Sequence, residues 1–245
     1  KNLLTLNTDK SYFCIFRTVQ SHMLNLPEKI EFNGKFINRS NSIKYLGITL
    51  DENINWNEHV TNLTKSLKSL FTVFYNIRRY LTKEHARVIY YTMIYSKVKY
   101  GICAYGFTKG ENINKLQVLQ NRLLKVLLEK KIRFSTNELH KELDVLKVGD
   151  LFRQELSSFV CNYFKGNLPD VFCNYFQTFS QIHSINTRGN TDRLIIPLHR
   201  TDFGEETVKV TGCKVWNMLN QEQKDIGNPK AFRKAFRINT ISSYI

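Results

Sequence analysis

Basic side chains next to aromatic ones are the residues of this chain best suited to contact a partner chemically. Arg78, Arg79 and Tyr80 are consecutive, and a second basic set lies between residues 115 and 133. Lysine and arginine contact phosphates, while aromatic rings stack on bases. Each position alone is better explained as solvated surface or as a cation at a helix C-terminus. Together they favour nucleic-acid binding by Arg78, Arg79, Lys83, Lys115, Arg122, Lys125, Lys130, Lys131 and Arg133.

Catalytic carboxylates are the next group to look for, because clustered carboxylates hold the divalent ions of polymerases and nucleases. This chain has no Asp-Asp pair, and its aspartates are scattered over expected turns and helix starts. It also lacks a P-loop, a Gly-x-Ser-x-Gly elbow and a His-Glu-x-x-His pair. The residues therefore predict no catalytic site and argue against an independent nuclease.

A zinc site is the remaining metal-binding hypothesis. Its candidate ligands stand in the last third of the chain, further apart than in zinc fingers: Cys161, Cys173, His183, His199 and Cys213. Buried thiols and polar-face histidines are the favoured interpretation, and a weak zinc site stays open. The odd number of five cysteines predicts a reducing intracellular compartment, with nucleus and cytoplasm both open.

Composition restricts the class of partner. The 245 residues include 36 Lys and Arg against 21 Asp and Glu, a net charge of +15. The 42% hydrophobic and 13% aromatic content excludes a disordered protein. A mean hydropathy of -0.34, without an uncharged apolar run of about 18 residues, argues against a membrane span. The expected partner is a polyanion, nucleic acid first and an anionic membrane surface second.

The elements that must position these residues begin with strands. Asn33-Gly34 lies between two segments of alternating polar and apolar residues, 29–32 and 35–38, and predicts a β-hairpin. Residues 43–50 predict a third strand, interrupted by Gly47. The first part of the chain is thus expected to form a small antiparallel sheet.

The period of the apolar residues becomes helical from residue 57 onward. Capping residues and breaks then divide the segment. We expect helices over residues 57–81, from Thr82 through a central and buried stretch around residues 88–94, over 113–127, from Ser135 or Thr136, and over 150–164, with a break at 101–110.

The last third of the chain is predicted to be mixed. Residues 194–198 favour an edge strand, since Pro197 cannot donate to a ladder, and residues 207–211 are expected to pair with it as a β-hairpin. Two closing helices are predicted over residues 212–219 and 229–237. The predicted fold class is therefore α+β, mostly α.

One segment carries a family resemblance. Ile43-Lys44-Tyr45-Leu46-Gly47-Ile48-Thr49-Leu50-Asp51, followed by Trp56 and His59, resembles the reverse transcriptases of non-LTR (LINE-type, Jockey-like) retrotransposons. Segments 4–16, 119–125 and 183–188 are similar to further motifs of that family, in the same order. The resemblance implies the end of a polymerase palm at 1–56, a helical thumb at 57–133 and a C-terminal region at 134–245.

Site residues also follow from the resemblance. Lys10 matches a lysine near the phosphates of the incoming nucleotide. Four residues match the primer-grip strand: Lys44, Tyr45, Leu46 and Gly47. The family's Mg²⁺ ions are held by palm aspartates upstream of the matching segment. This chain, which opens at Lys1 without an initiator methionine, is therefore expected to be a fragment of a larger protein, with no catalytic residue or cofactor of its own.

Two functions remain open at this point. The first is a C-terminal fragment of an RNA-directed DNA polymerase, which holds an RNA template, an RNA–DNA hybrid or a DNA duplex by its backbone, beside the upstream palm and fingers of the same polyprotein. The second is a domesticated, non-catalytic module that binds protein or nucleic acid. Whether the chain belongs to an active enzyme is a question that its residues leave open.

Overall fold

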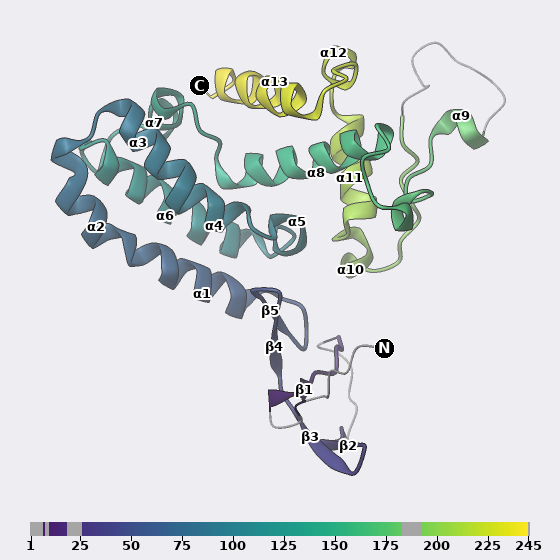
Figure 1. The fold of residues 1–245 in the computed structure, drawn as a ribbon. Helices are drawn as coiled ribbons and strands as arrows, with labels where there is room; N and C mark the ends of the chain where they lie inside the picture. The colour runs from purple at the N-terminus through teal and green to yellow at the C-terminus, as the bar shows by residue number, and fades with distance from the viewer. Residues whose placement is uncertain (1–6, 8–9, 19–25, 183–192, 245) are drawn as a thin grey trace. The chain divides into compact units, whose positions relative to one another are not determined.

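The computed structural model of the chain describes residue 7 and residues 10–18, 26–182 and 193–244 (Figure 1). The chain divides into two compact units, residues 1–65 and 66–245, and each is described by itself. The first unit contains all five strands of the described residues and the first part of the helix Asn57–Lys68, and the described part of the second unit is built of helices. The predicted class, α+β and mostly α, is confirmed. The division into palm, thumb and C-terminal region stays a prediction.

The first unit contains the predicted hairpin. Strands β2 (Lys29–Phe32) and β3 (Lys35–Arg39) pair antiparallel. Asn33 and Gly34 between them have φ angles of 50° and 72°, both in the left-handed region that a two-residue type I′ turn requires. Strand β1 (Tyr12–Phe13) joins β3 in parallel, so the sheet has the order β1-β3-β2.

The single strand predicted over residues 43–50 is wrong, because this segment is a second hairpin. Strands β4 (Ser42–Tyr45) and β5 (Ile48–Asp51) pair antiparallel around a two-residue turn. Leu46 and Gly47 form that turn with φ angles of 46° and 82°. Leucine rarely adopts a left-handed conformation, so the sequence carries only half of the usual turn signal.

A carboxylate orders the backbone between β5 and helix α1 (Asn57–Lys68). Oδ1 of Asp51 accepts hydrogen bonds from the backbone N–H groups of Asn53 and Asn55, at 3.1 and 3.2 Å. Its Oδ2 accepts from the N–H of Trp56 at 3.0 Å. This aspartate therefore has the turn-forming role that the sequence predicted for it.

The helix predicted over residues 57–81 is interrupted at Ser69. Helix α1 ends before it, α2 (Leu70–Ile77) follows, and a 3₁₀ turn, η2 (Arg78–Tyr80), ends the segment. The buried side chains of Leu70 and Phe74 still follow the predicted helical period.

Thr82 caps the next helix, as predicted. Its Oγ1 accepts from the N–H of His85 at 3.3 Å, and helix α3 (Lys83–Ile89) continues through a π-helical segment, η3 (Tyr90–Tyr95), into α4 (Ser96–Lys99). Tyr90 and Ile94 are buried. Val88 is 60% exposed, so the expectation that this stretch is buried all round is wrong. The predicted break contains a short helix, α5 (Ile102–Tyr105).

Helix α8 is the centre of the second unit (Figure 1). It spans Val148–Phe164 and packs against α6 (Gly110–Leu127), which in turn contacts α2 and α7 (Thr136–Leu143). Ser135 caps α7 through a hydrogen bond from the N–H of Glu138, which confirms the predicted start of that helix. These helices enclose a core that includes Leu116, Leu123, Leu139, Leu143, Leu151 and Leu156.

The hairpin predicted for the last third is wrong. Thr207 caps helix α11 (Val208–Asn217), since its Oγ1 accepts from the N–H of Val210 at 3.3 Å. Leu194 instead forms an isolated antiparallel bridge with Thr178. The remaining elements are η4 (Asp170–Phe172), α9 (Phe179–Ile182), α10 (Asp202–Glu205), α12 (Gln221–Lys224) and α13 (Pro229–Ser242).

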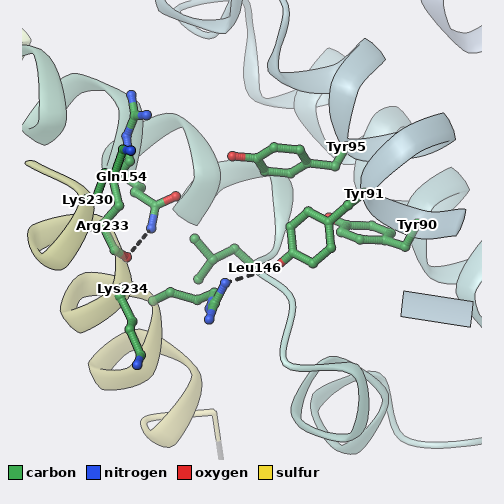
Figure 2. Close-up of a pocket in the computed structure, with 9 residues that line it drawn as sticks. Tyr90, Tyr91, Tyr95, Leu146, Gln154, Lys230, Arg233 and Lys234 are labelled. Atoms are coloured by element: carbon green, nitrogen blue, oxygen red, sulfur yellow. Dashed lines mark hydrogen bonds between the residues drawn. The ribbon is translucent and has the colours of Figure 1, made fainter. Parts of the chain in front are cut away.

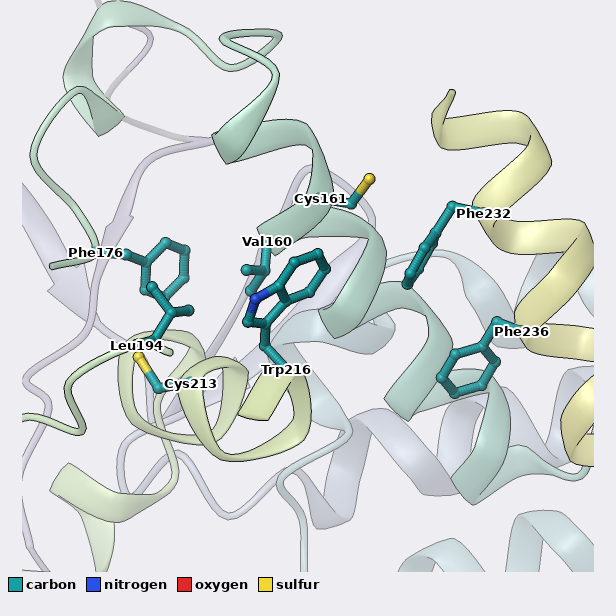
Figure 3. Packing of buried hydrophobic residues seen from close by; sticks show 8 residues of the cluster. All are labelled: Val160, Cys161, Phe176, Leu194, Cys213, Trp216, Phe232 and Phe236. Atoms are coloured by element: carbon teal, nitrogen blue, oxygen red, sulfur yellow. The ribbon is translucent and has the colours of Figure 1, made fainter. Parts of the chain in front are cut away.

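Helices α8, α11 and α13 share an aromatic cluster (Figure 3). The Trp216 ring lies 5.3 Å from that of Phe164 and 6.0 Å from that of Phe232. Trp216 is 3% exposed and therefore belongs to the core. Burial of large rings contributes most of the apolar driving force per residue, so this cluster fixes both closing helices onto α8.

Candidate nucleic-acid interface

A groove between α2 and α6 brings together four of the nine predicted phosphate contacts. It has a volume of about 530 Å³ and is enclosed by η2, α6 and the turn that follows α6. The basic residues that line it are Arg78, Arg122, Lys125 and Lys130, and the apolar and polar ones are Phe71, Tyr75, Val118, Asn121, Val126, Ile132 and Thr136. We call this the α2–α6 groove.

Arg78 is held in place at one wall of the α2–α6 groove. Its guanidinium lies 3.7 Å from the centre of the Tyr75 ring, and its Nε lies 3.3 Å from a carboxylate oxygen of Glu129. The stacked pair presents a cation and an exposed aromatic ring side by side. This is the combination that contacts both phosphates and bases in nucleic-acid complexes.

The other basic residues differ in how firmly the protein holds them. Lys125 donates to the carbonyl of Ile132 at 2.6 Å, and Lys130 pairs with Glu142 at 2.9 Å. Arg122 is exposed and forms no ion pair within the part of the chain that the structure describes. The α2–α6 groove therefore combines two paired cations, Arg78 and Lys130, with two that face no carboxylate among the described residues.

The structure does not bring the remaining predicted contacts into the α2–α6 groove. Lys115 pairs with Glu111 one turn away, at 2.8 Å, on an exposed part of α6. Four further residues are exposed on neighbouring turns without lining the groove: Arg79, Lys83, Lys131 and Arg133. Their contact with nucleic acid stays a prediction.

The predicted contacts in the first unit are all exposed. Lys10 lies in a short 3₁₀ turn, where its N–H donates to the carbonyl of Asn7 at 3.2 Å. The primer-grip-like segment, residues 44–47, is the tip of the β4–β5 hairpin, with Tyr45 and Leu46 pointing to solvent. Exposure makes both segments available to a partner, and their roles toward nucleotide and primer stay predictions.

Buried amides and a histidine hold α6 from behind. Gln120 donates to the Tyr90 hydroxyl and to the carbonyl of Leu146, both at 2.9 Å. His140 is fully buried with Nδ1 3.0 Å from the carbonyl of Val145, and burial lowers its pKa to about 4. A neutral imidazole therefore lies behind the α2–α6 groove.

A second basic pocket is present that the sequence did not predict. It lies between η3 and α13, with a volume of about 350 Å³ (Figure 2). Tyr90, Tyr91, Tyr95, Leu146 and Gln154 line it together with Lys230, Arg233, Lys234 and Arg237. These four basic residues follow one another at steps of three, one and three residues. That spacing places them in a stripe on one face of the helix. That spacing is the signal in the sequence for a basic stripe, where only a closing helix is predicted over residues 229–237. We call this the α13 pocket.

The zinc hypothesis gains no support from the described residues. Cys161 and Cys213 are both buried in the aromatic cluster (Figure 3), where burial raises the pKa of each thiol, to about 11 for Cys213. Only the thiolate binds zinc, so this environment opposes coordination. The residues that the structure describes contain no group of three His, Cys, Asp or Glu able to hold a metal. His183 and segment 183–188 lie outside the described residues, as do residues 4–6.

Within the described ranges, no helix has both the length and the apolar character needed to cross a membrane.

Comparison with known proteins finds similarity to polymerases of mobile elements. The chain is 27% identical over 128 residues to the RNA-directed DNA polymerase from mobile element jockey of Drosophila funebris, which covers 51% of this chain and 14% of that protein. The jockey polymerase of Drosophila melanogaster is 27% identical over 124 residues, or 49% of this chain and 14% of that protein. The probable RNA-directed DNA polymerase from transposon BS of Drosophila melanogaster is 26% identical over 134 residues, or 53% and 15%.

These matches confirm the resemblance to reverse transcriptases of non-LTR retrotransposons over about half of the chain. The matching part spans no more than about a seventh of each of these polymerases. No family model matches the chain. No solved structure matches it either.

Proposed function

We propose that this chain is the nucleic-acid-holding part of a non-LTR retrotransposon reverse transcriptase, and that the α2–α6 groove contacts the backbone of a primer–template duplex. The similarity to RNA-directed DNA polymerases supports a polyanionic partner, as does the net charge of +15. The observation that carries the proposal is the convergence of Arg78, Arg122 and Lys125 on one groove beside an exposed tyrosine.

Contact with the backbone rather than with base edges follows from the groove's residues. Its cations come from the 3₁₀ turn η2, from helix α6 and from the turn that follows α6, which suits them to a line of phosphates. Phosphate contacts release counterions, so binding through this groove weakens steeply as salt rises. The affinity for a duplex is therefore expected to depend on the number of basic side chains that contact phosphates far more than on the base sequence of the duplex.

The double variant Arg122→Gln, Lys125→Gln tests the groove. Both residues lie on α6, and neither pairs with a carboxylate within the described residues. Duplex or RNA–DNA hybrid binding is measured by fluorescence anisotropy across a salt series. The slope of log affinity against log salt should become shallower by about 1.8, at roughly 0.9 for each phosphate that the variant no longer neutralises.

The matched control is the double variant Lys29→Gln, Lys35→Gln, which removes the same charge from exposed positions of β2 and β3. It should keep the wild-type salt slope. A groove variant that binds duplex with wild-type affinity and slope would contradict the proposal, because the charge would then act only as a diffuse attraction.

The proposed role is binding without polymerisation. The sequence has no Asp-Asp pair, and the metal-binding carboxylates of the related polymerases are expected elsewhere in the full protein. Purified chain supplied with primer–template, dNTPs and Mg²⁺ should incorporate no nucleotide, while an intact reverse transcriptase in the same buffer extends the primer. Extension by the chain alone would overturn this part of the proposal.

The upstream palm and fingers are the proposed protein partner. Ile30 and Phe32 are exposed on one face of the β2–β3 hairpin and Phe36 is exposed on the other. Exposed apolar side chains on a small hairpin favour protein contact. Co-purification of the chain with a separately expressed upstream segment should be abolished when Phe32 and Phe36 are both replaced by serine. Unchanged co-purification would locate the contact elsewhere.

A domesticated interaction module is the second candidate, and one observation favours it. Arg78, Lys115 and Lys130 each pair with a glutamate of the same chain, which lowers the charge available to phosphates. Such a module would bind a protein partner with little dependence on salt. Absent or salt-insensitive nucleic-acid binding, together with a stable protein partner, would favour this function over the first.

A further inference from the structure

The α13 pocket combines basic side chains and tyrosines from two distant parts of the chain (Figure 2). In the figure, α13 stands on one side of the pocket and the three tyrosines stand on the other, with Leu146 between them. The pocket shares no lining residue with the α2–α6 groove. An inference about it therefore goes beyond the proposed duplex grip and does not depend on it.

The pocket has more positive than negative charge, even though two acids stand close by. Glu155 pairs with both Lys99 and Arg233, at 3.2 and 2.9 Å. Asp144 likewise pairs with both Arg87 and Arg237. Each of these two carboxylates is thus shared between two basic side chains, so a net charge of +1 remains around Glu155 and around Asp144.

Two further lysines add to this excess. Lys230 and Lys234 lie one turn apart on α13, and neither forms an ion pair within the described part of the chain. Long exposed lysine side chains reach bound anions without rearrangement of the fold. The site is therefore electropositive, with Arg233 and Arg237 fixed by carboxylates and the two lysines available to an anion.

The tyrosine side supplies an aromatic platform. Tyr91 and Tyr95 both belong to the π-helical segment η3, and their ring centres lie 5.0 Å apart with the planes inclined at 64°. The hydroxyl of Tyr91 is 3.2 Å from Nη1 of Arg237, which connects the two walls. Both rings are only partly buried, so a planar group can stack against them.

We propose that the α13 pocket binds one nucleotide unit, its phosphate on Lys230 and Lys234 and its base against Tyr95. A volume of about 350 Å³ is at the small end of ligand sites and too small for a duplex. The unit comes either from a free mononucleotide or from a single-stranded nucleic acid. Sequence-tolerant stacking with a cationic wall is the usual chemistry of single-strand sites.

The lysine test uses the full chain and three fluorescent probes: a mononucleotide, a single-stranded oligonucleotide and a blunt duplex. The double variant Lys230→Gln, Lys234→Gln should bind the single strand about tenfold more weakly, with a salt slope shallower by roughly 0.7 for each phosphate left without its lysine. Its duplex affinity should stay within about twofold of wild type. The control Lys29→Gln, Lys35→Gln should bind all three probes like wild type.

The probes also separate the two sources of the ligand. If the mononucleotide binds and its affinity falls in the lysine variant, the pocket takes free nucleotides. If only the single strand binds and loses affinity in the lysine variant, the pocket takes a nucleotide unit of a polymer. Unchanged binding of both probes in the lysine variant would overturn the proposal. The α2–α6 groove is tested by a different variant, Arg122→Gln, Lys125→Gln. A negative result for one site therefore does not change the interpretation of the result for the other.

A second pair of variants tests the ring. Tyr95→Leu should weaken single-strand binding about tenfold, whereas Tyr95→Phe should keep it, because stacking needs the ring and not the hydroxyl. An abasic oligonucleotide should bind wild type and Tyr95→Leu equally. Equal binding of a normal oligonucleotide by Tyr95→Leu and wild type, in protein of wild-type melting temperature, would exclude the assigned role of the ring.

Discussion

The α2–α6 groove and the α13 pocket contain the same number of basic residues, but they differ in how carboxylates compensate them. In the α2–α6 groove, Arg78 and Lys130 each have a glutamate of their own. In the α13 pocket, Glu155 and Asp144 are each shared by two bases. Counting basic residues therefore overestimates the positive charge of the α2–α6 groove, whereas at the α13 pocket Lys99 and Arg87 offset the two acids. The local ratio of acids to bases decides which site attracts an anion.

The two sites also depend on different parts of the core. The α2–α6 groove rests on α6, which the part-buried amide of Gln117 and the buried amide of Gln120 connect to its neighbours. The α13 pocket exists only while α13 stays docked on α8 through Phe232 and Phe236. Each site can thus be damaged separately, and four changes test this separation.

Phe232→Ala should have the largest effect. The Phe232 ring is buried against Trp216, and removing it leaves a cavity that costs about 3–5 kcal/mol of unfolding free energy. Single-strand binding should fall with the docking of α13, while duplex binding by folded protein should persist. Urea unfolding and the two binding assays measure these effects. An equal decrease of both binding activities in folded protein would show that the sites are not separable.

Acidification should act on the frame behind the α2–α6 groove. Burial lowers the pKa of His140 from 6.5 to about 4 in the folded chain, so the unfolded chain takes up its proton first. The contribution of neutral His140 to the free energy of unfolding is fully present above about pH 6.5. It falls by about 3 kcal/mol as the pH drops toward 4. Unfolding is measured between pH 4 and 8 for wild type and His140→Gln.

The difference between the two pH profiles isolates His140 from other groups that titrate, including His59, whose pKa burial also lowers. The variant should be less stable at pH 7, and its stability should fall less between pH 6.5 and 4. Parallel profiles would mean that His140 is protonated in the folded chain.

Glu155→Gln should act in opposite directions on stability and on binding. Its carboxylate is 8% exposed and compensates Lys99 and Arg233, so neutralising it should cost about 1–2 kcal/mol, at the low end because Arg233 is 41% exposed. Single-strand affinity should rise about threefold, since the pocket gains one net positive charge. Thermal unfolding and anisotropy measure both. Weaker single-strand binding would show that Glu155 positions Arg233 for the ligand.

Glu142→Gln should have the smallest effect. The Lys130–Glu142 pair is partly exposed, so removing it should change stability by less than about 0.5 kcal/mol. Lys130 would then be available to phosphates, and duplex affinity should rise about twofold at low salt. Titration at two salt concentrations measures it, with Lys29→Gln, Lys35→Gln as the reference. A fall in duplex affinity would indicate that the pair shapes the groove.

Local sequence was sufficient to predict the helical class, the β2–β3 hairpin and the helix starts at Thr82 and Ser135. These features depend on neighbours in the chain: Asn33-Gly34 sets a local turn, and a threonine or serine side chain caps the next backbone N–H groups. Their physical causes act within a few residues, so the local pattern is enough. The same locality misled the prediction at Leu46, where the tertiary fold holds a leucine in a left-handed turn.

Which charges meet and which cancel depends on the tertiary structure. Arg87 and Arg237 share Asp144, and Arg233 and Lys99 share Glu155, although the members of each set are far apart in the sequence. Packing likewise makes Thr207 the start of a helix rather than of a strand, because α11 places its buried face, including Trp216, against α8. Coulombic attraction and burial depend on distance in space, and a single sequence does not specify those distances.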